Sequence, residues 1–133
     1  QCVLGTLDQN GYPYLSKTIP LYYKNKIFLL LSDLSDHTEN LKNNKKVSIY
    51  FAREETHKER LNNPRLTLLG LIKKLKLNKN DELFIKLLKK YALIEKSAKM
   101  WGKFLDFNFY EFNIQNSIYV KGFGKAYKKV FWL

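Results

Sequence analysis

The chain has 133 residues, 45% of them hydrophobic and 15% aromatic, which suffices for one globular domain, 1–133, but is short for two. Its net charge of +12 comes almost entirely from lysine. Arginine, the residue best suited to paired hydrogen bonds with phosphates and bases, is scarce, and asparagine is abundant as well. A biased nucleotide composition produces this pattern unaided, so nucleic-acid binding is kept only as a third and less favoured hypothesis.

Two features that the sequence lacks, a membrane-spanning run and a second cysteine, suggest its cellular compartment. No apolar run is long enough to span a membrane. The single cysteine, Cys2, excludes an internal disulfide and favours the reducing cytoplasm. Because the chain begins with Gln1 and the first residues already have a strand pattern, we expect a further segment before it, and an extension after the last residue is also open.

The first third of the chain predicts three strands in an antiparallel meander. Its apolar runs are rich in β-formers, and Asn10-Gly11 supplies the positive φ of a tight hairpin turn. The expected strands are residues 3–7, 14–23 and 27–31, joined by turns at 8–11 and 24–26.

Two helices and further strands follow. Asp36 and Glu39 have the spacing of a capping box, which predicts a short helix over residues 36–43. A second, long helix should open at Asn80 and continue to Trp101, because its apolar residues recur with the helical period. The remaining expected elements are strands at 47–52 and 65–76, a surface loop at 53–64, and a final hairpin of 107–114 and 117–123 turned at Gln115-Asn116. Together they predict a mainly β fold, a small barrel of six to seven antiparallel strands with one short and one long helix.

Three stretches resemble a known superfamily. They are LGTLDQNGYPYLSKTIPLYY, LSDLSDHTENLKNNKKVSIYFA and YEFNIQNSIYVKGFGKAY, and the last contains the most specific piece, Gly-Phe-Gly-x-Ala-Tyr. In this order they are similar to the FMN-binding split-barrel superfamily, which includes pyridoxamine 5′-phosphate oxidase. Within it the chain most resembles the HugZ family of haem-utilisation proteins. The resemblance implies a split β-barrel with its cofactor between two subunits of a homodimer.

The glycines of this last motif do not form a dinucleotide-binding loop. That fingerprint needs a third glycine and a following helix, whereas Gly124 is followed by Lys125, Ala126 and Tyr127. A bend or β-bulge near the barrel rim is the better explanation for the pair Gly122 and Gly124.

The best anion site lies at the start of the helix over residues 36–43. Its free N–H groups and dipole favour a phosphate, and the nearby hydroxyl and imidazole groups add donors, although Asp36 would repel one. The resemblance implies that this turn holds the FMN phosphate and that a basic residue on the second strand assists. The candidate cofactor-binding residues are therefore Lys17, Ser32, Ser35, His37 and Thr38.

Haem is the alternative cofactor. Haem needs an axial ligand, which the resemblance places in a histidine beyond the glycine motif, where this chain has none. His57 lies in a charged loop and is expected to be solvated, while Cys2 and Met100 lie in apolar patterns and are expected in the core. We assign no catalytic residue and no metal site.

The sequence thus supports a cofactor-binding split barrel. An FMN-binding, oxidoreductase-like protein is the first hypothesis, and a haem-binding or haem-degrading protein of iron acquisition is the alternative. True pyridoxamine 5′-phosphate oxidase activity is not expected, because the arginine-rich C-terminal pattern of those enzymes is missing. The aromatic residues Tyr110, Phe112, Tyr119 and Phe123 are expected on exposed strand faces, where they would favour a homodimer.

Overall fold

The computed structural model describes residues 1–53, 58, 63–122 and 125–130. These residues form eight strands and three helices. In chain order they are β1 (Cys2–Leu7), β2 (Pro13–Thr18), β3 (Pro20–Tyr23), β4 (Lys26–Ser32), α1 (Asp36–Asn43), β5 (Lys46–Ala52), β6 (Arg65–Lys74), α2 (Glu82–Ile94), α3 (Ala98–Trp101), β7 (Phe107–Gly122) and β8 (Lys125–Val130). The predicted split barrel, with a short and a long helix, is confirmed.

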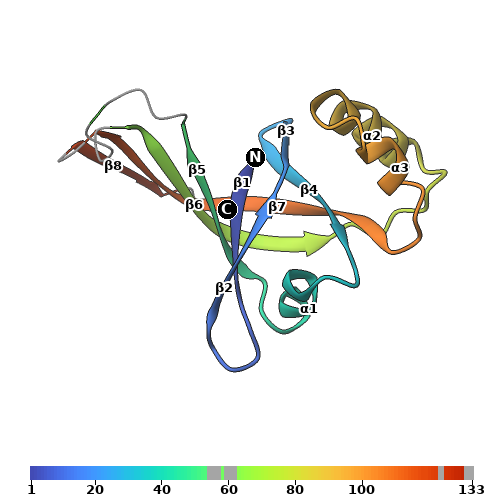
Figure 1. The fold of residues 1–133 in the computed structure, drawn as a ribbon, viewed down its shortest axis with the longest axis horizontal. Coiled ribbons are helices and arrows are strands. Elements are labelled where there is room, and N and C mark those ends of the chain that lie inside the picture. Colours follow the sequence, from blue (N-terminus) through green and yellow to red (C-terminus); the bar gives the residue numbers. More distant parts are fainter. Residues whose placement is uncertain (54–57, 59–62, 123–124, 131–133) are drawn as a thin grey trace.

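One antiparallel sheet curls into the barrel. Its strand order is β2-β1-β5-β6-β7-β4-β3, with β8 added alongside β7. The two ends of this order, β2 and β3, are separated in the chain only by Ile19, so one continuous segment joins both edges of the sheet. Figure 1 shows the strongly bent sheet, with β8 and the α2–α3 lobe at opposite ends of the view.

The predicted three-strand meander is wrong for this reason. The expected strand over residues 14–23 is two strands, and β2 pairs with β1 whereas β3 pairs with β4. Pro20, which has no N–H to donate, stands at the break and begins β3.

The predicted final hairpin is also wrong. β7 runs without interruption for 16 residues through the expected turn at Gln115-Asn116. Its pairing with β6 shifts between Leu69 and Gly70, from Asn116 to Ile114, which leaves Gln115 as the extra residue of a β-bulge. A second shift, in the pairing with β8, lies between Val120 and Gly122 and agrees with the irregularity predicted at the first glycine of the motif. Phe123 and Gly124 lie outside the described residues.

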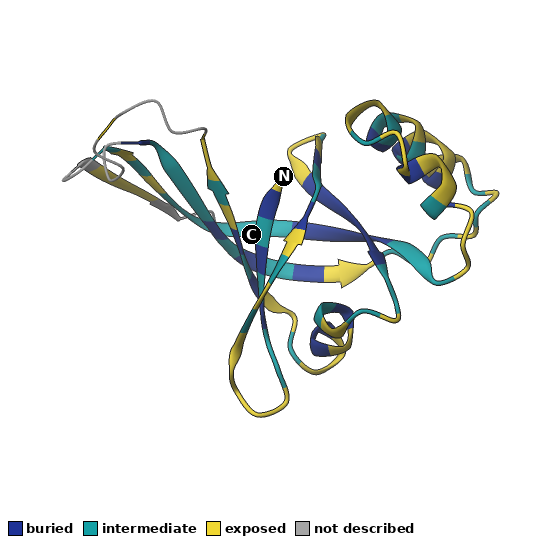
Figure 2. Ribbon diagram, in the orientation of Figure 1, coloured by how far each residue is buried: buried dark blue, intermediate teal, exposed yellow. Residues whose placement is uncertain are grey.

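Two hydrophobic cores share the sheet, and Figure 2 shows the buried segments of both. The side chains of β4 alternate between them: Ile27, Leu29 and Leu31 face the barrel interior, whereas Phe28 and Leu30 face the helical lobe. This burial on both faces explains the continuous apolar run of β4. The second core attaches α2 and α3 to the outside of the barrel.

The long predicted helix is interrupted. Glu95 leaves the helical conformation (φ −135°, ψ 105°), so α2 ends at Ile94 and the separate turn α3 carries Trp101. The break turns Met100 outward, 57% exposed, which corrects its expected place in the core, while Cys2 is buried as predicted.

Two of the four expected surface aromatic residues are in fact buried. Tyr110 and Phe112 belong to the barrel core, because the uninterrupted β7 directs them inward. Tyr119 is exposed and stacks on Tyr127 of β8. Phe123 lies outside the described residues.

No helix in the described part of the chain is both long enough and apolar enough to span a bilayer.

Candidate cofactor site

A pocket of about 160 Å³ opens where the ends of β2 and β4, the start of α1 and the helical lobe meet. Four of the five predicted cofactor-binding residues line it: Lys17, Ser32, Ser35 and His37. They give the lining its polar groups and one lysine. The rest of the lining is mainly apolar and includes Ile19, Leu30, Tyr91, Trp101 and Phe107. We call this cavity the cofactor pocket.

The start of α1 is built differently from the predicted capping box. Ser35, not Asp36, is the N-cap, and its carbonyl accepts hydrogen bonds from the N–H groups of Thr38 and Glu39. The Ser35 side chain makes no capping bond, so its hydroxyl stays available to the pocket. Asp36 is the first helical residue, and its carboxylate accepts a hydrogen bond from the hydroxyl of Tyr14 at 3.5 Å.

Thr38 does not line the cofactor pocket. It is buried, and its hydroxyl donates to the carbonyl of Ser32 at 2.6 Å. The side chain therefore holds the end of β4 against α1 and positions Ser32 and Ser35 from behind.

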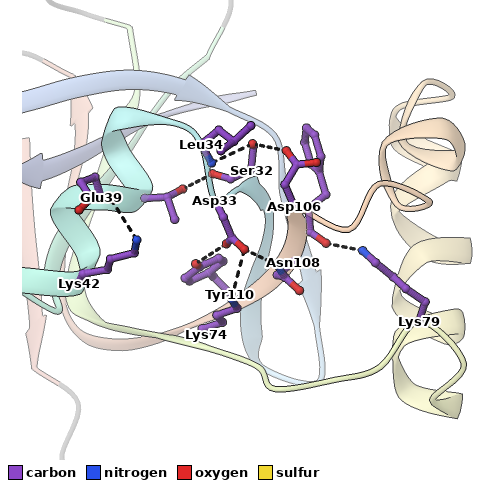
Figure 3. A network of polar contacts seen from close by, with 12 residues as sticks. Ser32, Asp33, Leu34, Glu39, Lys42, Lys74, Lys79, Asp106, Asn108 and Tyr110 are labelled. Carbon is purple, nitrogen blue, oxygen red and sulfur yellow. Dashed lines mark hydrogen bonds and ion pairs between the residues drawn. The ribbon is translucent and has the colours of Figure 1, made fainter.

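A polar network fixes this turn to the start of β7 (Figure 3). Ser32 donates to the carboxylate of Asp106 at 2.7 Å. Asp33 accepts hydrogen bonds from the amide of Asn108 at 2.9 Å and from the hydroxyl of Tyr110 at 3.3 Å. Burial, together with the neighbouring Asp33 carboxylate, raises the pKa of Tyr110, so this phenol stays a proton donor. The polar wall of the pocket is thus preorganised.

The apolar part of the pocket lining includes an aromatic wall. The rings of Trp101 and Phe107 stack with centroids 6.1 Å apart and an interplanar angle of 21°. Tyr91 is buried beside them and donates its hydroxyl to the carbonyl of Ile19. The sequence indicated Tyr91 and Trp101 only as apolar helix positions. Nothing in the sequence pattern indicated the break at Glu95, which turns α3 toward the pocket.

The surroundings of His37 favour its neutral form. Its Nδ1 lies 3.0 Å from the hydroxyl oxygen of Ser16, and its Nε2 is buried with no hydrogen-bond partner among the described residues. Burial lowers the pKa of His37, although the Asp36 carboxylate opposes this. Lys17, rather than an imidazolium, therefore supplies the positive charge of the pocket.

Acid should destabilise the protein through His37. Its pKa is about 6.5 in the unfolded chain and lower in the folded one, so the unfolded state binds more protons as the pH falls below 6.5. The free energy of unfolding should decrease over this range, and His37→Gln should flatten the decrease. Urea unfolding of both proteins at about pH 7.5 and about pH 5.5 measures it. Parallel losses in the two proteins would contradict the assignment.

The fold and the pocket can now be compared with known proteins. A family model described as "CREG, beta-barrel" matches residues 8–130. The chain belongs to the CREG β-barrel family. It is 26% identical over 133 residues to the haem oxygenase HutZ of Vibrio cholerae, covering 94% of this chain and 71% of HutZ.

Solved structures show the same fold. A haem-binding protein from Mycobacterium smegmatis superposes with a TM-score of 0.85 at 21% identity, over 97% of this chain and 52% of that one. ChuZ of Campylobacter jejuni gives 0.85 at 24% identity, over 97% and 53%. A general stress protein 26 relative of the pyridoxinephosphate oxidase family, from Clostridium acetobutylicum, gives 0.71 at 20% identity, over 97% and 84%. The chain spans about half the length of the first two, and the predicted resemblance is confirmed.

The cofactor pocket of this CREG β-barrel protein fits part of a cofactor. Lys17 and the Ser35 hydroxyl suit an anionic group, and the stacked pair Trp101 and Phe107 suits a planar ring. The cavity is below the roughly 300–1,000 Å³ typical of ligand sites, so it is too small to hold the whole of FMN or haem. No cluster that could hold a bare metal ion occurs among the described residues, and His57 lies outside them.

Proposed function

We propose that this protein binds haem in the cofactor pocket and acts as a haem-utilisation protein. The observation that carries the proposal is the pocket itself, whose lining combines a lysine and the donors of the β4–α1 turn with a stacked aromatic pair. A haem has the same two parts, carboxylates at one edge and a planar apolar ring. The similarity to HutZ over nearly the whole chain supports haem over other ligands of this shape.

The residues of the pocket take distinct roles in this proposal. Lys17 neutralises a propionate, Ser35 hydrogen-bonds to it, and Trp101 with Phe107 holds the ring. The bound haem would supply the redox and oxygen chemistry of its iron. His37 is not proposed as the axial ligand, because its Nε2 is buried and cannot meet the iron without rearrangement.

FMN remains the second candidate, for a specific reason. The N-terminus of α1 with the free Ser35 hydroxyl is a phosphate-binding arrangement, and haem has no phosphate. A member of the pyridoxinephosphate oxidase family shares the fold. With this cofactor the activity would be that of an FMN-dependent oxidoreductase.

We also infer that two copies of the chain complete the site. The pocket encloses part of a ligand only, and the exposed, stacked Tyr119 and Tyr127 on β7 and β8 offer an apolar surface outside the barrel. A cytoplasmic homodimer, with the Cys2 thiol kept reduced and buried, is the assembly we propose.

Absorption titrations of the purified protein with haemin and with FMN test the proposal. Haemin should saturate at one equivalent per subunit, and Lys17→Gln should weaken its binding about tenfold, because a charge-assisted hydrogen bond is lost. Lys46→Gln is the matched control, since it removes the same charge from an exposed site on β5 outside the pocket. Tight FMN binding without haemin binding would favour the second candidate.

Equal haemin affinities for Lys17→Gln and Lys46→Gln would contradict the proposed pocket. Gel filtration with and without haemin tests the assembly, and a monomer that saturates with haemin would contradict the homodimer.

A further inference from the structure

A second, larger cavity lies within the helical lobe. It measures about 340 Å³ and is formed between α2 and the end of α3. The apolar side chains of Phe84, Ile85 and Leu88 form its floor, and Lys99 and Lys103 stand on the opposite side. We call it the α2–α3 pocket. Its volume is within the range of ordinary ligand sites.

The α2–α3 pocket is distinct from the cofactor pocket. The two cavities share no lining residue. α3 and the residues that follow it separate them, because Trp101 lines the cofactor pocket whereas Lys99, Gly102 and Lys103 line the other. A ligand of one pocket therefore does not need to enter the other.

The width of this pocket is fixed by close packing. Gly102 is buried, and a Cβ added to it would lie 2.6 Å from the terminal carbons of Leu88. The chain after α3 thus rests directly on α2. The cavity beside this contact is part of the folded lobe and does not require the helices to separate.

The charge around the pocket has one sign. Four lysines line it and no carboxylate does. Lys79 is engaged, with its ammonium 4.6 Å from the ring centroid of Phe84 and bonded to the carbonyl of Phe107. In the described part of the chain the other three, Lys89, Lys99 and Lys103, are exposed and form no ion pair. An anion bound here would meet three unpaired ammonium groups.

We propose that the α2–α3 pocket binds an aliphatic carboxylate, with its chain on the apolar floor and its charge between Lys99 and Lys103. An inorganic anion would leave the floor of Ile85 and Leu88 uncovered, and a nucleotide would find no exposed aromatic ring there on which to stack. Only a ligand that has both an aliphatic chain and a negative charge matches the apolar floor and the unpaired cations together.

Isothermal titration calorimetry with dodecanoate, below its micelle concentration, tests this site. Dodecanoate should bind at one equivalent per chain, while acetate and dodecanol, which each lack one part, should bind far more weakly. Lys99→Gln with Lys103→Gln should weaken dodecanoate binding about fivefold or more. Lys86→Gln with Lys90→Gln is the matched control, because these lysines lie over the ring of Tyr23, outside the pocket.

A second variant tests the floor. Ile85 is 47% exposed, so Ile85→Trp can fill the cavity without disturbing the core, and it should abolish dodecanoate binding while haemin binding is unchanged. Equal weakening by both lysine pairs would show a general charge effect and overturn the proposal. Displacement of dodecanoate by one equivalent of haemin would also overturn it. So would co-sedimentation of both the natural protein and Ile85→Trp with phosphatidylglycerol vesicles if the natural protein bound no free dodecanoate.

Discussion

Gly70→Ala should lower the free energy of unfolding by about 3 kcal/mol, the upper end of the usual cost of overpacking. A Cβ at this position would lie 2.1 Å from the carbonyl oxygen of Asn113 and 2.9 Å from the ring of Phe112. The first of these atoms belongs to the backbone of β7, so it cannot move aside as a flexible side chain can. Relief would require β6 and β7 to separate where their register already shifts.

Urea unfolding measures this loss, and Gly5→Ala is its control. Gly5 also lies in a central strand, but an added Cβ there would make only ordinary contacts, the nearest at 3.5 Å to Leu15. We expect that variant to stay within about 0.5 kcal/mol of the natural protein. If both substitutions had the same small effect, the bulge would be able to relax, and Gly70 would not be required by space.

The same bulge shows what the sequence could not reveal. Gln115-Asn116 interrupts an apolar pattern, and such an interruption is equally consistent with a turn or with a bulge in a continuous strand. Whether a turn or a bulge forms depends on β6, which is distant in the chain and must be long enough to pair on both sides of Gln115-Asn116. β6 does so from Arg65 to Lys74, and this long-range pairing overrides the local signal.

The division of residues 13–23 has a similar cause. The local pattern indicates extended chain throughout, and the chain is indeed extended in both β2 and β3. Which neighbour each half pairs with is decided by the closure of the barrel, which no window of the sequence contains. The prediction of one long helix from Asn80 was wrong for the opposite reason. The apolar pattern continues past Glu95, whereas the backbone leaves the helical conformation at that residue.

Of the residues that line the cofactor pocket, the sequence pointed to polar ones only. The motif around Ser32 to Thr38 and the strand position of Lys17 led to residues of which four share one cavity. The aromatic half, Trp101 with Phe107, comes from elements distant in the chain and becomes a wall only after α3 has turned. Polar motifs are local and can be recognised in the sequence, whereas the apolar wall forms only through tertiary packing.

The ring of Phe109 is one of the buried contacts that attach the helical lobe to the sheet. Phe109→Ala should lower the free energy of unfolding by about 3–5 kcal/mol, because a fully buried phenyl group is replaced by a cavity. Phe109 is 1% exposed, and its ring packs edge-to-face against Phe84 at 5.2 Å and Tyr91 at 6.0 Å. Urea unfolding measures the loss. Phe104→Ala, the same change at a 46% exposed ring of the lobe, should cost less than half as much.

Hydrogen exchange in Phe109→Ala would locate the damage. Because Phe109 belongs to the core between α2 and the sheet and not to the barrel interior, the amides of α2 should lose more protection than those of β5. Haemin affinity should fall with them, since Tyr91 and Trp101 of the cofactor pocket are carried by the loosened lobe. Equal loss of protection in α2 and β5 would instead mean that lobe and barrel unfold as one unit, and that the aromatic wall is as stable as the barrel that faces it.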